Sequence, residues 1–250
     1  IDEKVRHANT KLADLHLVAS EEARERVIRL GEDPRFVINT GCASIDLAQQ
    51  VSDAPLSFDP IEKYGGVGAT ILPKDQYLVV MQHPVTNEYE KAKEDVTKTL
   101  EVISDSGLPT FWFWPNVDSG ADGTSKGIRT FRELKNPKNI RFFKNMEPHD
   151  FLCLLNHSAA LVGNSSVGIR ECGYLGIPVV NIGTRQHNRQ RGHNVIDVDY
   201  DKKEIANAIQ ECIKSGKKPR ATHFGNGKAG RAIAEVLATA ELRYHKTITY

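Results

Sequence analysis

The stretch that decides the fold is Ala160-Leu161-Val162-Gly163-Asn164-Ser165-Ser166-Val167-Gly168-Ile169-Arg170-Glu171-Cys172-Gly173. It opens with a short apolar run typical of a buried strand, and the Gly-Asn-Ser-Ser turn that follows predicts the start of an amphipathic helix. Hydroxyls and unpaired backbone N–H groups at a helix start can bind an anion. A second apolar strand, 178–183, leads directly into Thr184-Arg185-Gln186. Because the connection is short, both strands should end at one sheet edge, where we expect a nucleotide diphosphate.

Outward from this stretch, apolar segments alternate with amphipathic ones along most of the chain. Strands are expected at 15–19, 35–39, 77–82, 110–114, 140–143, 160–163, 178–182 and 195–198. Helices are expected at 2–13, 20–30, 44–51, 87–106, 125–136, 148–157, from 166, at 202–214 and at 229–242. Residues 52–75 are rich in Pro, Gly and Asp, which indicates a long connection with little regular structure. The alternation predicts an α/β fold with a Rossmann-like parallel sheet covered on both faces.

The composition is that of an ordinary globular protein. The 250 residues carry 33 Lys and Arg against 32 Asp and Glu, so bulk charge gives no support to nucleic-acid binding. No apolar run approaches the roughly 20 residues that span a bilayer, and no signal peptide is visible. The four cysteines fit no metal-binding spacing. We expect a cytoplasmic protein with reduced cysteines and with no metal, membrane or nucleic-acid partner.

Polar side chains follow four of the predicted strands. They are His83, Asn116, the pair Ser165-Ser166, and Arg185. The carboxyl ends of parallel strands share one edge of the sheet. Four polar strand ends on one edge indicate a ligand site more strongly than any one of them alone.

The Ser165-Ser166 turn and the two charged residues after it form the first candidate site. The hydroxyls and backbone N–H groups can hold phosphate oxygens, and Arg170 lies beside them. Glu171, expected about a turn and a half into the helix, can accept hydrogen bonds from two ribose hydroxyls. The alternative is a plain helix cap with a surface Arg–Glu pair. The Gly-Thr-Arg-Gln sequence that follows the next strand favours the functional interpretation.

The segment 183–194 concentrates three arginines and two histidines after a buried strand. Arginine can bind phosphate through two parallel hydrogen bonds, so Arg185 and its neighbour Gln186 are candidate phosphate ligands. The alternative is a solvated loop. His83, held between Gln82 and Pro84, is expected either to donate to a phosphate or to titrate near neutrality, although a lone histidine is often structural.

Two further features have weaker interpretations. Trp112 and Trp114 alternate with phenylalanines, and a strand buried on both faces explains them better than stacking on a base. Asp2 and His7 share a face of the first predicted helix and can do acid–base chemistry, but alone they are more typical of a solvated face. The chain opens in this charged segment without an initiator Met, so we expect either that residues upstream of it are missing or that the chain was cut.

Taken together, these motifs resemble the UDP-N-acetylglucosamine 2-epimerase family, in particular its hydrolysing branch. The resemblance runs nearly end to end through Ile1-Asp2-Glu3…Arg6-His7-Ala8…Thr10-Lys11-Leu12, Gln82-His83-Pro84-Val85-Thr86, Pro115-Asn116-Val117-Asp118, Gly163-Asn164-Ser165-Ser166…Gly168…Arg170-Glu171, Gly176…Pro178-Val179…Asn181…Gly183-Thr184-Arg185-Gln186 and Gly225-Asn226-Gly227. The non-hydrolysing branch tends to carry Asp-Ser-Gly-Gly where this chain has Gly-Asn-Ser-Ser.

The resemblance implies the C-terminal half of a two-domain GT-B fold, with the family's active site in the cleft between two Rossmann-like domains. Residues 1–39 would end the first domain, 40–222 would form the second, UDP-binding domain, and 223–250 would return toward the first. Most of the first domain would be absent, so we expect this chain alone to be inactive. The family also implies a homo-oligomer, a dimer or a tetramer.

The family's chemistry, as the resemblance implies it, removes the proton at C2 of the sugar and expels UDP by anti elimination. Hydrolysing members then add water to the 2-acetamidoglucal intermediate, releasing N-acetylmannosamine and UDP without a cofactor. Asp2 would be the acid–base residue, with His7 supporting it. The residues that would bind UDP or substrate are His83, Asn116, Ser165, Ser166, Arg170, Glu171, Arg185 and Gln186. The alternatives are a non-hydrolysing epimerase, an epimerase of a diacetamido sugar, and a GT-B glycosyltransferase-like UDP-binding module.

Overall fold

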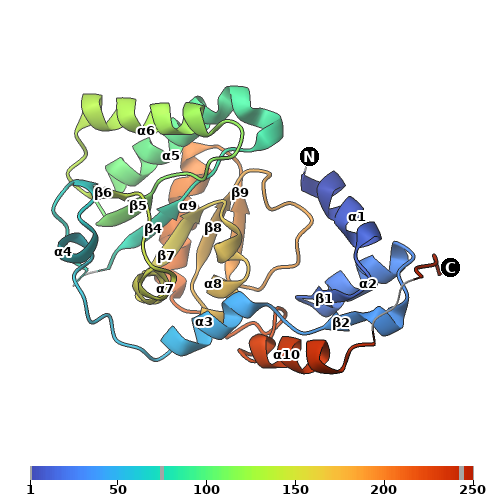
Figure 1. Ribbon diagram of the computed structural model, residues 1–250. Helices are drawn as coiled ribbons and strands as arrows, with labels where there is room; N and C mark the ends of the chain where they lie inside the picture. Colours follow the sequence, from blue (N-terminus) through green and yellow to red (C-terminus); the bar gives the residue numbers. More distant parts are fainter. Residues whose placement is uncertain (1, 74–75, 242–244, 250) are drawn as a thin grey trace. The chain divides into compact units, whose positions relative to one another are not determined.

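The structure is a computed structural model that describes residues 2–73, 76–241 and 245–249, with the main chain alone at positions 2 and 3 (Figure 1). Its contacts divide the chain into two units: Ile1–Gln50 together with Thr222–Tyr250, and Val51–Ala221. We call them unit 1 and unit 2 and describe each by itself.

Unit 2 is built on a seven-stranded sheet of order β3-β6-β5-β4-β7-β8-β9. Its strands are β3 (Val67–Gly68), β4 (Leu78–Met81), β5 (Thr110–Phe113), β6 (Ile140–Phe143), β7 (Ala160–Gly163), β8 (Val179–Ile182) and β9 (Val195–Val198). All are parallel except β3, which pairs antiparallel with β6. The chain runs outward from β4 to β6 and then returns to the other side of β4 at β7. This reversal is the topological switch point of a Rossmann-like sheet, so the predicted fold class is confirmed.

Helices cover both faces of this sheet (Figure 1). One face carries α5 (Ala92–Ser106), α6 (Ala121–Lys135) and α9 (Lys202–Ser215), and the other carries α7 (Pro148–Asn156) and α8 (Glu171–Leu175). Side chains alternate between the faces because of the strand pleat. Val80 and Trp112 therefore pack in the core under α5, α6 and α9, whereas Phe113 meets Phe151 of α7 edge to face at 5.1 Å. The predicted burial of Trp112 is confirmed, with the ring fully buried.

Four expectations for unit 2 need correction. The connection 52–75 contains a short helix, α4 (Pro60–Tyr64), and the edge strand β3, which the Arg141 guanidinium holds through the carbonyls of Gly65 and Gly68. Helix α6 begins before residue 125, and the helix expected from 87 opens with a 3-10 segment, Thr86–Lys91. The helix expected from 166 is broken into the 3-10 turn η3 (Ser166–Gly168) and the short α8.

The break before α8 follows from close packing on the sheet. A Cβ atom built on Gly168 would lie only 2.9 Å from Val179, so this segment runs flat against β8. A continuous helix with full side chains does not fit so close to the strand. Glu171 is consequently the first residue of α8 instead of lying within a longer helix.

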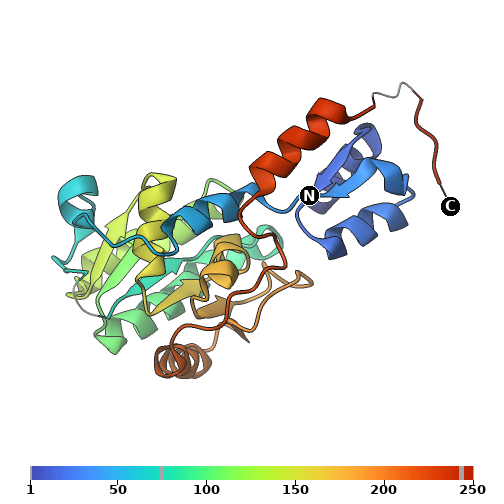
Figure 2. The same ribbon diagram turned by 90° about the horizontal axis from the view of Figure 1, so that it is seen from below.

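Unit 1 contains a two-stranded parallel sheet of β1 (His16–Val18) and β2 (Val37–Asn39). Its helices are α1 (Asp2–Leu12), α2 (Glu21–Arg29), α3 (Ala43–Val51) and α10 (Ala229–Thr239), with a 3-10 turn at Pro34–Phe36. Ser20 caps α2 as predicted, its hydroxyl accepting from the N–H of Ala23. Helix α10 lies beside the small sheet in both views (Figure 2). Asp46 of α3 accepts from the N–H groups of Ala229 and Gly230, which ties α3 to α10.

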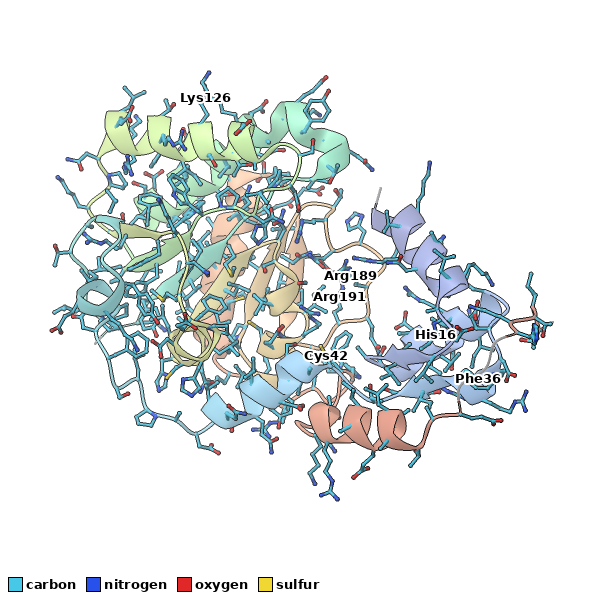
Figure 3. All side chains as sticks on the ribbon, in the orientation of Figure 1. His16, Phe36, Cys42, Lys126, Arg189 and Arg191 are labelled. Atoms are coloured by element: carbon cyan, nitrogen blue, oxygen red, sulfur yellow. The ribbon has the colours of Figure 1, made fainter. Side chains whose placement is uncertain are left out.

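A buried carboxylate organises the rest of unit 1. Glu32 is 1 % exposed and lies 3.1 Å from His16 Nε2, 3.0 Å from Lys11 Nζ and 2.7 Å from Lys246 Nζ. Lys246 also donates to the main-chain carbonyls of Thr10 and Ala13, at the end of α1. Glu32 thus links β1, which carries His16 (Figure 3), to α1 and to the C-terminal tail. In the part of the chain that is described, no helix is both long and apolar enough for a membrane span.

Candidate functional site

The polar strand ends gather at the carboxyl edge of the sheet around the β4–β7 switch point. Strands β5, β4, β7 and β8 are consecutive neighbours there. They are followed, in that order, by Asn116, His83, Ser165 and Arg185. The four ends share one edge, as predicted, and the crevice outside such strand ends is the usual ligand site of doubly wound sheets.

His83 is buried beside the end of β4. Its Nδ1 accepts a hydrogen bond from the main-chain N–H of Asn116 at 3.1 Å, so the ring proton lies on Nε2, which can donate to a ligand oxygen. Burial, aided by the Arg185 guanidinium, lowers the pKa of His83 to about 4. The imidazole is therefore neutral near pH 7. The predicted titration near neutrality is wrong, whereas donation to a phosphate stays a prediction.

Asn116, Asp118 and Arg185 complete a closed ring of contacts with His83. The Asn116 side-chain amide donates to the Asp118 carboxylate, which lies 3.5 Å from Arg185 Nη2. Arg185 Nη1 donates to the carbonyl of Asn164 at 3.2 Å, and the Asn164 side chain holds the main chain of His83. The ring fixes a neutral donor and a cation near each other, and a quarter of the Arg185 side chain stays exposed to an incoming anion.

The Ser165-Ser166 turn follows β7 directly. Ser165 Oγ accepts from the N–H of Val167 at 3.4 Å, and Ser166 Oγ accepts from Arg170 Nη2 at 3.3 Å, which leaves both hydroxyl protons available. Over the described ranges, the main-chain N–H groups of Ser165 and Ser166 meet no acceptor. Because η3 is a single turn, the predicted anion would be bound by these four donors and by Arg185, and not by the dipole of a long helix.

Glu171 is 6 % exposed at the start of α8. Its Oε2 accepts no hydrogen bond from the described residues, and Arg170 Nε lies 3.7 Å away. A buried carboxylate oxygen without a donor costs free energy, which ribose hydroxyls would recover once the side chain turns toward them. The predicted ribose contact therefore has a physical reason in the structure and stays a prediction.

The loop between β8 and β9 is less available to a ligand than its sequence suggests. Arg191 pairs with Asp197 and donates to the carbonyl of Gln186 at 2.5 Å, so it braces the loop (Figure 3). Gln186 is 1 % exposed, and its Nε2 donates to the carbonyl of Asn164 at 2.8 Å. Of the predicted ligands in this loop, Arg185 is partly exposed at the site. Gln186 is buried, and it contacts Asn164 instead of the solvent-facing side of the site.

Asp2 and His7 belong to α1 of unit 1, where His7 is exposed. The side chain of Asp2 lies outside the described residues. Their proposed acid–base roles stay predictions. The sequence reasoning assigned no role to Asn164 or Asp118, although both stand inside motifs that it quoted, because their importance lies in contacts between different strand ends. Over the described residues, no group of three His, Cys, Asp or Glu side chains is arranged to hold a metal ion.

A doubly wound sheet with hydroxyls, N–H groups and an arginine at its switch point defines an α/β domain suited to a phosphorylated ligand. The profile of the UDP-N-acetylglucosamine 2-epimerase family matches residues 1–238, and the chain belongs to this family. The membership of this family that the motifs predicted is therefore confirmed.

Individual relatives agree with this assignment. Over 244 residues the chain is 32 % identical to UDP-N-acetylglucosamine 2-epimerase of Neisseria meningitidis serogroup B, covering 96 % of this chain and 62 % of that protein. It is 29 % identical to UDP-N,N'-diacetylbacillosamine 2-epimerase (hydrolyzing) of Legionella pneumophila, over 97 % of this chain and 62 % of that protein. The crystal structure of UDP-GlcNAc 2-epimerase from Neisseria meningitidis bound to UDP-GlcNAc has the same fold, with a TM-score of 0.69 at 17 % identity, over 92 % of this chain and 62 % of that one. This chain thus spans 62 % of the length of these relatives.

Proposed function

We propose that unit 2 binds UDP, and that the whole protein is a hydrolysing UDP-N-acetylglucosamine 2-epimerase in the synthesis of sialic-acid-type sugars. The observation that carries the proposal is the ring of His83, Asn116, Asp118, Arg185 and Asn164, closed across the switch point next to the Ser165-Ser166 donors. Membership of the family and the hydrolysing relative from Legionella support the class of reaction. Unit 1 then contributes the end of the first domain and the returning C-terminal helix.

The reaction determines what these groups must do. Removal of the C2 proton and departure of UDP build negative charge on the diphosphate, so donors that are already oriented lower the barrier most. Arg185, the Ser165 and Ser166 donors, and the Nε2–H of neutral His83 are assigned to that diphosphate. Glu171 is assigned to the ribose hydroxyls. The acid–base step at C2 is assigned to Asp2, with His7 in support.

The other predicted ligands have supporting positions in this proposal. Asn116 fixes the His83 tautomer through its N–H, and its side-chain carbonyl oxygen has no donor among the described residues. Arg170 holds the Ser166 hydroxyl, and Gln186 supports Asn164. No cofactor enters the reaction, because elimination and addition of water balance without one.

The chain should bind UDP saturably, and the double variant Ser166→Ala with Arg185→Ala should bind it about 100-fold more weakly, because one charge-assisted and one neutral hydrogen bond are lost. Isothermal titration of both proteins with UDP measures this difference. The control is Ser125→Ala with Arg129→Ala, on the outer helix α6, which should leave the affinity unchanged. Equal UDP binding by the site variant, or no saturable binding by the parent chain, would contradict the proposed site.

The same titration with 2'-deoxy-UDP examines the ribose contact separately. If Glu171 accepts from a ribose hydroxyl, Glu171→Gln should weaken UDP binding more than 2'-deoxy-UDP binding. Equal weakening of both ligands would remove Glu171 from the ribose site and leave the diphosphate assignment standing.

The intact parent protein should release UDP and N-acetylmannosamine from UDP-N-acetylglucosamine, and the 250-residue chain alone should show no turnover above background, because it spans only 62 % of the length of its relatives. Proton NMR of the reaction mixture follows both products. Accumulation of UDP-N-acetylmannosamine would assign the non-hydrolysing reaction instead. Robust turnover by the chain alone would contradict the division of labour proposed for the two domains.

A further inference from the structure

We propose that Asn164 is a positioning residue for the diphosphate site, and that it sets the separation of His83 and Arg185. This inference rests on the proposed function of that site. Asn164 is fully buried, so it reaches no ligand itself. It follows β7 at the switch point, where the ladder between β4 and β7 ends with the pair Met81 and Gly163.

The side chain of Asn164 extends that ladder by one step. Its Oδ1 accepts from the main-chain N–H of His83 at 2.7 Å, and its Nδ2 donates to the His83 carbonyl at 2.9 Å. Its own N–H donates to the carbonyl of Met81 at 3.0 Å. One side chain therefore holds both peptide groups of His83 at the point where the two strands separate. This fixes the position of the His83 Cα atom, from which the imidazole extends.

The main-chain carbonyl of Asn164 holds the opposite side of the site. It accepts from Arg185 Nη1 at 3.2 Å and from Gln186 Nε2 at 2.8 Å. One residue thus anchors the loop after β8 and the end of β4 at the same time. The guanidinium and the imidazole are positioned relative to a single residue. A side-chain substitution leaves the carbonyl that holds Arg185 in place, so it should disturb the imidazole and spare the guanidinium.

The amide of asparagine is the side chain that meets these requirements. An aspartate could accept from the His83 N–H but could not donate to the His83 carbonyl unless protonated. A serine is too short to span both groups, and a glutamine adds a methylene in a fully buried position. The structure therefore explains why an amide of this length stands between the strand and the Ser165-Ser166 donors.

The test compares Asn164→Ser with Asn156→Ser. Asn156 is a matched control: it is also buried and donates to two main-chain carbonyls, those of Val51 and Ser52, but it does not touch the ring. Isothermal titration with UDP should show at least about 10-fold weaker binding for Asn164→Ser, and a change within about twofold for Asn156→Ser. Equal losses in the two variants would mean that general destabilisation, and not positioning, is responsible.

A double-mutant cycle separates positioning of His83 from other effects. In a His83→Ala background the peptide groups held by Asn164 remain, but no imidazole is left to orient. Adding Asn164→Ser should then weaken UDP binding by less than about threefold, because Asn164 acts on UDP through the position of the His83 imidazole. A full loss of about 10-fold in that background would overturn the proposed route.

The state of the His83 ring gives a readout that does not need UDP. In ¹⁵N NMR of the ligand-free chain, His83 should be one tautomer with the proton on Nε2, since Nδ1 accepts from Asn116. In Asn164→Ser the ring should exchange between tautomers, and its pKa should rise from about 4 toward the usual value of 6.5. A single tautomer and an unchanged pKa in the variant would overturn the proposal.

One outcome distinguishes this inference from the proposed function. If the parent chain binds no UDP but the variant frees the His83 ring, the function fails and the positioning holds. Should Asn164→Ser not fold, Asn164→Asp keeps the acceptor for the His83 N–H and places a carboxylate near an imidazole that already faces Arg185 and Asp118. The pKa of His83 should then rise above about 4, and an unchanged value would contradict the contact.

Discussion

Replacing Gly163 by alanine is expected to lower the free energy of unfolding of unit 2 by about 4 kcal/mol. Gly163 ends β7 with φ at +132°, a conformation that L side chains rarely adopt. A Cβ atom there would lie 2.1 Å from the carbonyl oxygen of Met81 on the neighbouring β4. Backbone cannot move aside as a flexible side chain can, so the strain and the clash add, and β7 must separate from β4 at the switch point.

Trp112 and Trp114 make this effect measurable, because both tryptophans of the chain belong to unit 2. Urea unfolding followed by their fluorescence should show the loss, equivalent to about 10 °C in Tm for a unit of this size. Gly107→Ala is the matched control: φ is +68°, and a Cβ atom at this position would have no neighbour within 4 Å. It should cost about 1 kcal/mol. Similar losses at both positions would show that the contact with Met81 is not what requires glycine.

The central strands could be predicted from the sequence because they are buried on both faces. A strand such as β4 or β7 then has a continuous apolar run, and turn residues mark where it ends. Polar residues immediately after those runs must lie on one edge once the strands are parallel. This is why His83, Asn116 and Arg185 could be predicted to lie at one edge of the sheet without coordinates.

Other parts of the fold depend on contacts that no local pattern encodes. Strand β3 has two residues, and its place beside β6 depends on the Arg141 guanidinium, which reaches back to the connection before it. The break before α8 depends on how closely Gly168 approaches Val179. Both features depend on contacts between residues that are distant in the chain, and hydrophobic periodicity does not predict such contacts.

The candidate site shows the same division. Residue type and position predicted the groups that we assign to a ligand, but did not predict the residues that hold those groups in place. Asp118 and Asn164 connect the segments that follow β5, β4, β7 and β8 through their contacts with Arg185 and His83. Arg191, in contrast, forms an ion pair with Asp197 of β9, the strand that follows its own loop. The protonation state of His83 also depended on burial and on Arg185, neither of which its neighbours in sequence reveal.

Glu32→Gln is expected to destabilise unit 1 by about 3 kcal/mol, because the variant removes the one negative charge that Lys11, Lys246 and His16 share. Burial alone would raise the pKa of Glu32, but hydrogen bonds from Lys246, Lys11 and His16 outweigh it and lower the pKa from 4.5 to about 2. The carboxylate therefore stabilises the fold fully above about pH 4.5, and this contribution is lost as the pH falls toward 2.

Hydrogen exchange of the β2 segment measures this effect, since the N–H of Thr40 donates to the carbonyl of Val18 across the small sheet. At pH 7 the slowest amides there should exchange about 100-fold faster in Glu32→Gln. In the parent, the protection of these amides should fall between about pH 4.5 and pH 2 as Glu32 is protonated. In the variant, the protection should lack this pH dependence, because the titrating carboxylate is absent. Glu25→Gln, which breaks an exposed pair with Arg29, should change exchange by less than about fivefold. If Glu25→Gln and Glu32→Gln behaved alike, the buried carboxylate would not be what secures the tail against α1, the helix that carries Asp2 and His7.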